Sequence, residues 1–568
     1  MDDKINIKFL HKQVLKNISG EFKACELTAV MGPSGSGKSS LLNVLSGYVV
    51  RTNVSGEIHS KETPKRSYIM QEQNLHKLLT VRESMMFSMN LKTGFDKSSD
   101  EKKSKVKEIL EHLGLDQRTE TFVCALSGGQ QKRLSIALEL VGDPLVLFLD
   151  EPTTGLDSSS SSQCIHLLKR LAREGKTVIC TIHTPSALLF QMFDHLYAMS
   201  EGECIYQGSS QNLVTFLSES ELKCPESYNP SDFLMEIANG DYGLHNEQLT
   251  EKIANGKNES YRKEKENFKV SQKFEIETPS GSRTSFITQE VSSFINQLYQ
   301  LMLRNFLILY RDKSVMWLRL FIHIAVSLLV GAVFENSGGE ASKIFSIFKL
   351  IYAITIFLMY TAFYSMVTRF SLDAAMIKRE HFNRWYSTPA YYSAMSLTDV
   401  PLTAACTVIF VTTLYVMSDL PLEEFRFTAF LMIQLLLSFV AQGFGMMIGS
   451  LFTLMGALLF AAVLLPVIVL FGGVVITRKD ANVFFHWVFD ICFVKHAGDA
   501  SISSILGYNR TKLTCEDTVY CHFQQPKKFL DAIGVGDTIT YQSIIMLVIF
   551  LILFRLVAFY MINYRLKH

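Results

Sequence analysis

The chain has 568 residues, of which 48% are hydrophobic, and its formal net charge at pH 7 is +1. This length exceeds that of one ordinary domain, so we expect two or more. The near-zero charge provides no long-range field that would attract nucleic acid, and this argues against such a partner. A mean hydropathy of +0.18 suits a chain that lies partly in lipid. The apolar residues concentrate beyond residue 314.

Residues 1–240 are predicted to form an α/β domain. Short apolar runs at Leu27–Met31, Leu145–Asp150 and Thr177–Ile182 alternate with helical patterns. Because each run is apolar throughout, we expect strands that are buried on both faces of a parallel sheet. The first 30 residues contain no continuous apolar segment of the secretory type. We therefore expect this domain to lie in the cytosol.

The composition changes over residues 241–290. The stretch Glu251–Lys273 is rich in Glu, Lys and Asn, and a Pro-Ser-Gly-Ser run follows at Pro279–Ser282. These features predict a flexible linker. The next segment, 291–313, is predicted to be an amphipathic connecting helix at the membrane surface, because its apolar residues recur on one side.

Residues 314–568 are predicted to form an all-α transmembrane domain with six helices. Each of six apolar segments is close to the roughly 20 residues that a helix needs to cross the hydrocarbon core. Six in succession disfavour the alternative of buried core helices in a soluble protein. Basic residues between the second and third segments place that loop in the cytosol. The segments are Val315–Phe334, Ile344–Val367, Tyr391–Val416, Phe427–Leu451, Leu454–Ile476 and Tyr541–Asn563.

The long loop 477–540 follows the fifth predicted span, and we expect it to be lumenal or extracellular. Asn509 begins an Asn-Arg-Thr glycosylation sequon. That signal is weak alone, because three other sequons lie in the predicted cytosolic half. Cys515 and Cys521 in the same loop are either a disulfide pair, which an oxidising compartment favours, or two free thiols.

The eight residues 32–39 fit the phosphate-loop pattern Gly-x-x-x-x-Gly-Lys-Ser. They follow the predicted strand Leu27–Met31 and open a helical pattern, which is the context that this motif requires. The backbone N–H groups and the helix N-terminus are suited to bind phosphate. Lys38 is expected to reach the β- and γ-phosphates of ATP, and Ser39 to hold Mg²⁺. The loop consists of Gly32, Pro33, Ser34, Gly35, Ser36, Gly37, Lys38 and Ser39.

Two carboxylates end the apolar run that begins at Leu145. Asp150 is expected to anchor Mg²⁺, directly or through water. Glu151 is expected to orient and deprotonate the attacking water. A lone acidic strand end is usually a solvated turn, but its combination with a phosphate loop favours ATP hydrolysis.

A third motif lies about twenty residues before the acidic pair, and its residues are Leu126, Ser127, Gly128, Gly129 and Gln130. This pentapeptide resembles the signature of the ATP-binding cassette (ABC) proteins, which implies a P-loop ABC ATPase. In that family, the signature closes on the γ-phosphate of an ATP that the opposite subunit holds.

Three further positions match motifs of that family in the family's order. Gln71 resembles the Q-loop glutamine, which senses Mg²⁺ and touches the membrane domain. Asp157, in Gly-Leu-Asp, resembles the D-loop aspartate. His183, in Thr-Ile-His, resembles the switch histidine, which contacts the γ-phosphate. A lone histidine after a strand is usually structural, but here it completes an ordered set.

The cassette precedes the membrane domain, and the chain has one of each. This order resembles the G subfamily, the White-type half-transporters, over nearly the whole chain outside the linker. The Cys515…Cys521-His-Phe pattern looks most like the sterol- and lipid-handling branch. Gln130-Gln131 stands where the subfamily often has Glu-Arg, and Thr184 stands where it often has Gln.

The N-terminus also departs from the subfamily. Only 31 residues precede Gly32, fewer than most members have, and an incomplete start is one interpretation. Phe9 is the candidate for stacking on adenine.

The resemblance implies a dimer, because one cassette supplies only half of each ATP site. The second half-transporter is either another copy or a different chain. The predicted cytosolic loop Lys378–Tyr386, which contains Glu380, Arg384 and Trp385, is expected to transmit closure to the membrane domain, with Glu380 and Arg384 as the coupling residues. Asp399, early in the third span, is either functional or paired with Arg319 or a backbone group.

The sequence thus predicts an ATP-driven half-transporter that moves a sterol or another lipid across a membrane. The alternatives are a non-hydrolysing partner subunit, or a transporter of pigment precursors, steroid hormone or xenobiotics. ATP and Mg²⁺ are the implied cofactors, and membrane lipid, a lipophilic substrate and a second half-transporter are the implied partners. We expect a multi-pass protein of the plasma membrane, with internal membranes as the alternative.

Overall fold

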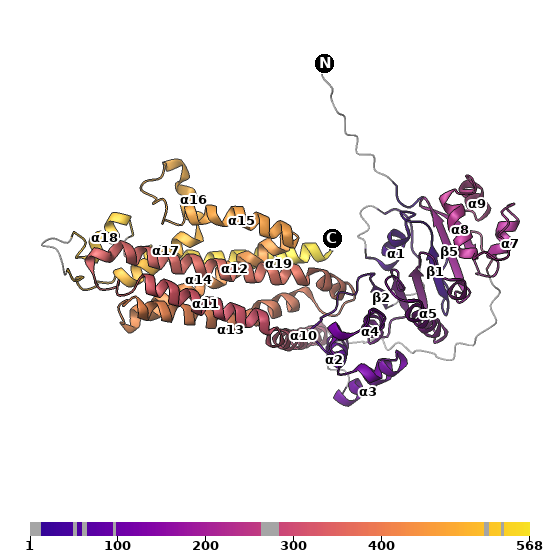
Figure 1. The fold of residues 1–568 in the computed structure, drawn as a ribbon, viewed down its shortest axis with the longest axis horizontal. Helices are drawn as coiled ribbons and strands as arrows, with labels where there is room; N and C mark the ends of the chain where they lie inside the picture. The colour runs from indigo at the N-terminus through magenta and orange to yellow at the C-terminus, as the bar shows by residue number, and fades with distance from the viewer. Residues whose placement is uncertain are drawn as a thin grey trace, which may run out of the picture. The chain divides into compact units, whose positions relative to one another are not determined.

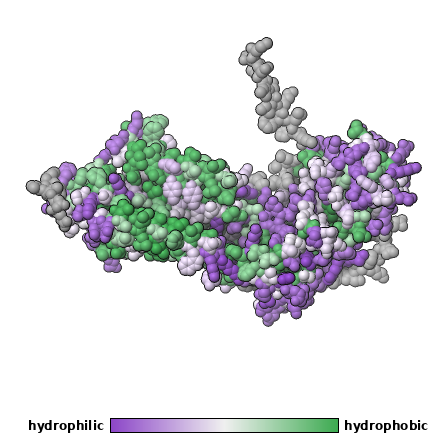
Figure 2. Space-filling view, in the orientation of Figure 1, coloured by the Kyte–Doolittle hydropathy of each residue, from purple (hydrophilic) through white to green (hydrophobic). Residues whose placement is uncertain are grey.

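The computed structural model describes residues 13–48, 54–59, 65–94, 98–262, 283–515, 522–535 and 539–567. The chain divides into two compact units. The first, the cassette unit, comprises Met1–Gln297 and Arg379–Tyr386. The second, the membrane unit, comprises Leu298–Lys378 and Ser387–Lys567. Apolar side chains gather over the helices of the membrane unit, whereas the visible face of the cassette unit is mostly polar (Figure 2).

A six-stranded sheet forms the centre of the cassette unit, in the order β2-β3-β4-β1-β5-β6. The three predicted runs form β1, β3 and β4, and all neighbours from β2 to β5 are parallel. The pair β5–β6 is antiparallel, unlike the expected parallel sheet, because only Glu201 and Gly202 join these strands as a tight hairpin. The strands are β1 (Leu27–Met31), β2 (Arg66–Ile69), β3 (Val146–Leu149), β4 (Thr177–Thr181), β5 (His195–Ser200) and β6 (Glu203–Gly208).

Helices cover this sheet, and three of them, α2–α4, pack on one another as a group (Figure 1). Each of these three begins with a capping box, in which an N-cap hydroxyl and a Glu or Gln three residues later exchange hydrogen bonds with the backbone. The helices of the unit include α1 (Lys38–Ser46), α2 (Val81–Thr93), α3 (Ser99–His112), α4 (Gly128–Leu140), α5 (Ser158–Arg173), α6 (Ala187–Phe190), α7 (Leu213–Ser218) and α8 (Pro230–Asn239).

The predicted linker 241–290 is wrong for its first part. Helix α9 (Asn246–Lys252) packs on the cassette with Leu249 and Ile253 fully buried. Arg262 then forms an ion pair with Glu26 at 3.2 Å. The stretch is mostly polar, so its composition did not indicate a packed helix. Leu249 and Ile253, four positions apart, lie on the same face of a helix and are enough to anchor it. Residues 263–282 lie outside the described part of the chain.

The connecting helix α10 (Arg283–Arg311) begins at Arg283, earlier than the predicted boundary at 291. Among the described residues, five helices are long and apolar enough to cross a membrane: α11 (Lys313–Val333), α12 (Ile344–Phe382), α13 (Thr388–Met417), α14 (Glu424–Leu451) and α19 (Ile539–Lys567). The predicted fifth span is shorter than expected, because α15 (Leu454–Leu470) has 17 residues. Its last residue is Leu470, and Gly473, three positions further along the chain, has a left-handed φ of 94°.

The loop 477–540 contributes to the interior of the membrane unit. It contains α16 (His486–Ile491), α17 (Phe493–Leu506) and α18 (Pro526–Ile533). Helix α17 packs against α14 and α19, and most of its residues are buried. The apolar part of this loop is therefore built into the helical core.

Candidate ATP site and its connections

The phosphate loop joins β1 to α1 at the centre of the sheet. Gly32 has a φ of 149°, and a Cβ there would lie 2.2 Å from the carbonyl oxygen of Met199, so only glycine fits. Nζ of Lys38 donates to the carbonyl oxygens of Gly32 (2.7 Å) and Pro33 (2.9 Å). Burial lowers the pKa of Lys38, and the carboxylates of Glu151 and Asp150 oppose this shift. The predicted loop lysine thus faces both predicted carboxylates.

Asp150 lies directly after β3, next to the start of α1. Its Oδ1 accepts hydrogen bonds from Oγ of Ser39 (3.2 Å) and from Oγ1 of Thr181 (2.7 Å). The same Thr181 hydroxyl accepts from the backbone N–H of Glu151 at 2.8 Å. Sequence reasoning missed Thr181. The sequence feature that could have identified Thr181 is a hydroxyl residue at the carboxyl end of β4, the strand that pairs with β3.

Glu151 is held by two further side chains. Its Oε2 accepts from Nε2 of Gln71 and from Oγ1 of Thr154, each at 2.8 Å. Across the site, Nε2 of His183 lies 3.1 Å from Oγ of Ser34 in the phosphate loop. The structure therefore brings together Lys38, Asp150, Glu151, Gln71 and His183, which are far apart in the sequence.

The residues present fit both predicted cofactors. The Ser39 hydroxyl, the Asp150 carboxylate and the Gln71 amide offer the oxygen ligands that Mg²⁺ prefers. The glycine-rich turn precedes α1, whose N-terminus could bind a phosphate through backbone N–H groups. Phe9, the candidate for stacking on adenine, lies outside the described residues.

The signature residues form the start of α4. Oγ of Ser127 accepts from the backbone N–H of Gln130, and Oε1 of Gln130 accepts from the backbone N–H of Ser127. Gln130 thus completes the capping box as a Glu would, since only an oxygen acceptor is needed. A Cβ at Gly129 would lie 2.8 Å from Oγ of Ser160, so α4 approaches α5 closely here. Leu126 is buried and Gly128 begins the helix.

Asp157 is the N-cap of α5. Its Oδ2 accepts from the backbone N–H of Ser160 at 3.1 Å. Hydrogen bonds from Ser160 lower the pKa of this carboxyl group. The predicted D-loop aspartate therefore also starts a helix.

Lys132 joins the signature helix to the Q-loop. This residue of α4 is 2% exposed, and its Nζ donates to the carbonyl oxygens of Met70 (3.1 Å) and Gln71 (3.3 Å). A lysine in a run of polar residues gave no sequence signal for this role.

The 379–386 segment packs within the cassette unit. Glu380 is 1% exposed, and its Oε1 lies 3.9 Å from Nε2 of His76 and from Nη2 of Arg379. Arg384 is exposed and has a left-handed φ of 56°. The two predicted residues therefore differ, because the Glu380 side chain is buried and the Arg384 side chain is exposed.

Asp399 of α13 forms an ion pair with Arg319 of α11. Nη1 of Arg319 donates to Oδ1 of Asp399 at 3.1 Å. Oδ2 of Asp399 accepts from Thr403 and from Gln442 of α14. Nη2 of Arg555, in α19, donates to Oε1 of Gln442 at 2.7 Å. A polar network thus joins four helices of the membrane unit.

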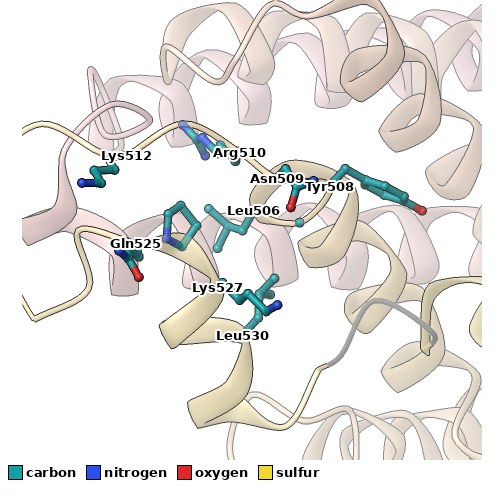
Figure 3. A pocket seen from close by; sticks show the side chains of 10 residues that line it. Leu506, Tyr508, Asn509, Arg510, Lys512, Gln525, Lys527 and Leu530 are labelled. Carbon is teal, nitrogen blue, oxygen red and sulfur yellow. The ribbon is translucent and has the colours of Figure 1, made fainter.

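The predicted lumenal residues lie near α18. Cys515 is disulfide-bonded, and Cys521 lies outside the described residues. Asn509 is exposed, and it lines a pocket of about 230 Å³. Figure 3 shows Asn509, Arg510 and Lys512 on one side of this pocket, and on the other side Gln525, the N-cap of α18, and Lys527 in α18. The sequon is therefore sterically accessible.

Two kinds of comparison with known proteins agree with this architecture. The family model described as "ABC transporter" matches residues 15–154. Two models described as "ABC-2 type transporter" match residues 296–506 and 183–255.

Curated relatives match the chain over most of its length. "ABC transporter G family member 7" of Arabidopsis thaliana is 30% identical over 504 residues, which cover 85% of this chain and 69% of the relative. "Protein scarlet" of Drosophila melanogaster is 29% identical over 97% of this chain and 86% of its own length. The "Broad substrate specificity ATP-binding cassette transporter ABCG2" of Mus musculus is 27% identical over 85% of this chain and 78% of its own length.

Proposed function

The chain belongs to the G family of ABC transporters, and from this membership we propose that it is a half-transporter that exports a sterol or another lipid. The coarser activity is established: the chain is an integral membrane protein whose soluble ATPase domain hydrolyses ATP to drive transport. The direction of transport, the substrate and the assembly are the proposed parts.

The arrangement of Glu151 carries the hydrolytic part of the proposal. Gln71 and Thr154 both donate to its Oε2, so the carboxylate is held in one position beside Asp150. Glu151 would orient the attacking water and accept its proton. Lys38 would bind the β- and γ-phosphates, and His183 would contact the γ-phosphate. Mg²⁺, held by Ser39, Asp150 and Gln71, would neutralise charge on the phosphate oxygens.

Two copies of this chain are proposed to suffice for activity. Each copy has the phosphate loop, both carboxylates, the signature serine and the switch histidine, so neither ATP site would need a different partner. Ser127 is the N-cap of α4. The N-terminus of this helix is suited to bind the γ-phosphate of an ATP held by the second copy.

A lipophilic substrate is supported by the membrane unit. Its interior contains aromatic pairs such as Phe357–Phe410, whose ring centroids lie 4.4 Å apart. The resemblance of the Cys515–Phe523 region to the sterol- and lipid-handling branch favours sterol over pigment precursors. We place the protein in the plasma membrane with its cassette in the cytosol, with internal membranes as the alternative.

Transport into sealed vesicles tests the proposal. Purified chain is reconstituted with outward-facing cassettes, and ATP-dependent movement of labelled sterol and labelled phospholipid is measured. We expect sterol movement that depends on ATP and is lost in Glu151→Gln, with hydrolysis about 10²–10⁴-fold lower. Glu120→Gln, at an exposed surface position, is the matched control and should transport normally. Wild-type ATP hydrolysis without movement of either lipid would contradict the substrate class.

A further inference from the structure

The pocket beside Asn509 lies between two segments of the membrane unit, the turn that follows α17 and the start of α18 (Figure 3). Its volume is about 230 Å³. Sites for drug-sized ligands typically have roughly 300–1,000 Å³. The pocket is therefore too small for a complete sterol or phospholipid, and its size suits one small chemical group.

The charge of this pocket is positive. Arg510, Lys512 and Lys527 are among the ten residues that line it, and none of the ten is acidic. The side chains of Lys512 and Lys527 are exposed and form no ion pair with any residue that the structure describes. By contrast, Arg478 in the same loop pairs with Asp490 at 3.0 Å. Charges of one sign that converge in a cleft attract counter-ions, so the pocket is suited to an anion.

Arg510 contributes a fixed positive charge. Its side chain is half-buried, and its Nη2 donates to the carbonyl oxygen of Gly338 at 2.6 Å. Burial and the charge of Arg426 lower the pKa of Arg510 to about 10, so the guanidinium stays charged at neutral pH. The two guanidinium groups repel each other, and a bound anion would offset this repulsion.

Arg426 also holds the turn that forms one wall of the pocket. Tyr508 and Asn509 have left-handed φ angles of 51° and 53°, which are unfavourable for residues with a side chain. The guanidinium of Arg426 is buried, and it donates to the carbonyl oxygens of Gly507 (2.8 Å) and Tyr508 (3.2 Å). These bonds fix the turn, so the wall is already shaped before a ligand arrives.

The same guanidinium removes a source of repulsion for an anion. Nη1 of Arg426 donates to the carbonyl oxygens of Ser504 and Ile505, both at 3.3 Å, at the C-terminal end of α17. Carbonyl groups at a helix C-terminus carry a negative partial charge. Because these carbonyls are paired with a buried cation, they oppose an anion in the pocket less.

The facing wall is the first turn of α18. Gln525 is the N-cap of this helix, and Lys527 lies in its first turn. The partial positive charge of a helix N-terminus adds to that of the lysine. At the other end of the helix, Nζ of Lys479 donates to the carbonyl oxygen of Asp531 at 2.7 Å, which fixes α18 against the rest of the loop.

We propose that this pocket binds a small oxyanion, namely a phosphate, sulfate or carboxylate group that carries a short apolar chain. The ammonium groups of Lys512 and Lys527 donate to its oxygens from the two walls, and Arg510 adds its fixed charge. Leu506 and Leu530 are buried and line the pocket, so they would contact the apolar chain. A soluble organic anion and a lipid headgroup share this chemistry. The site is independent of the proposed transport substrate.

Lysine footprinting of the full-length chain tests this proposal. The chain carries Asn509→Gln, so that no glycan stands at the rim, and it is placed in nanodiscs of phosphatidylcholine. Mass spectrometry measures the acetylation rate of each lysine. Butyl phosphate at about four times its Kd should slow acetylation of Lys512 and Lys527 by about fivefold, because only the unbound fraction reacts. Lys528 is exposed but does not line the pocket, so its rate should not change.

Trimethyl phosphate is the control for charge. It has the shape of a phosphate group but is neutral, so it should protect neither Lys512 nor Lys527. Protection by this neutral compound equal to that by butyl phosphate would overturn the proposal, as would equal protection of Lys528.

Two variants measure how much the lysines contribute. Lys512→Gln combined with Lys527→Gln removes both ammonium groups, and calorimetry should show that Kd for butyl phosphate rises by roughly 100-fold, about tenfold for each lost hydrogen bond to a charged group. Lys528→Gln is the matched control, since it removes a neighbouring charge of the same helix, and it should change Kd by no more than about twofold. Equal weakening by the double variant and by Lys528→Gln would contradict the assignment.

The lipid composition distinguishes the two sources of the oxyanion. Nanodiscs that contain phosphatidic acid supply a phosphate group from the membrane. Protection of Lys512 and Lys527 in these nanodiscs, without butyl phosphate, would identify a lipid headgroup as the ligand, and protection by the soluble probe alone would identify a soluble anion. Absence of protection under both conditions would overturn the proposal. These measurements need neither ATP nor transport, so a failure of the proposed export activity would leave the site standing.

Discussion

Oγ1 of Thr181 donates a 2.7 Å hydrogen bond to Oδ1 of Asp150. Oγ1 of Thr181 also accepts a hydrogen bond from the backbone N–H of Glu151, so one buried hydroxyl positions both acidic residues. The left-handed φ of 44° at Glu151 makes this support more important, since that conformation is unfavourable for a residue with a side chain.

Replacing Thr181 with Val keeps the shape of the side chain and removes the hydroxyl. We expect kcat for ATP hydrolysis to fall by roughly 10- to 100-fold, the effect of losing one hydrogen bond to a charged group. Thr181→Ser, which retains the hydroxyl, is the control and should stay close to wild type. Steady-state hydrolysis at saturating ATP and Mg²⁺ measures both. Equal impairment of the Ser and Val variants would show that packing, not hydrogen bonding, matters here.

The pairing of Asp399 with Arg319 predicts a large loss of stability when the carboxylate is removed. In Asp399→Ala, the guanidinium of Arg319 is left without its partner, and we expect a cost of roughly 3–5 kcal/mol. Asp490 forms an ion pair with Arg478 at 3.0 Å in which about half of each side chain is exposed. Asp490→Ala should therefore cost roughly 0–1 kcal/mol. Thermal unfolding in detergent compares the two variants, and similar losses would contradict the assignment.

The buried side chain of His195 is expected to make the stability of the cassette depend on pH. Burial, helped by the charge of Arg262, lowers the pKa of this histidine to about 3. Below about pH 6.5 the unfolded chain takes up a proton that the folded chain refuses until about pH 3. Stability should therefore fall as pH falls through this window, by up to roughly 1.4 kcal/mol per pH unit.

Pulse proteolysis of the full-length protein at about pH 7 and about pH 5.5 measures this effect. His195→Leu should weaken the dependence on pH, whereas His166→Gln, at an exposed position of α5, should not. An unchanged dependence in His195→Leu would show that other groups cause the acid response.

An N-linked glycan at Asn509 would show on which side of the membrane the loop 477–540 lies. We expect an N-linked glycan there, because Asn509 and Thr511 are both exposed. Asn509→Gln should abolish the electrophoretic shift that glycosidase treatment produces. Asn258→Gln is the matched control, since Oδ1 of Asn258 is engaged by Ser260 in the predicted cytosolic half. A shift that survives Asn509→Gln and disappears in Asn258→Gln would reverse the assigned topology.

The sequence predicted those parts of the site that are continuous in the chain. The phosphate loop follows β1 directly, the acidic pair follows β3, and the signature caps α4, so local patterns were sufficient for these residues. The roles of Thr181 and Lys132 were not predicted, because they depend on neighbours in space. Lys132 lies 61 residues from Gln71, whose carbonyl oxygen it binds.

Element boundaries were less predictable, for physical reasons that differ from case to case. The stretch around α9 was assigned to a linker because it is mostly polar, although Leu249 and Ile253 are buried on the cassette. The predicted fifth span was too long, because apolar residues continue past the end of α15.

Complementation between two defective copies tests the central claim, that each ATP site is shared by two chains. Copies that carry Lys38→Ala or Ser127→Arg are each expected to be inactive as homodimers. In a mixed dimer, isolated through two different tags, one site combines the intact phosphate loop of one copy with the intact signature of the other. The account predicts that ATP hydrolysis returns in the mixed dimer and disappears when Glu151→Gln is added to the Ser127→Arg copy. A mixed dimer that forms but stays as inactive as both parents would contradict it.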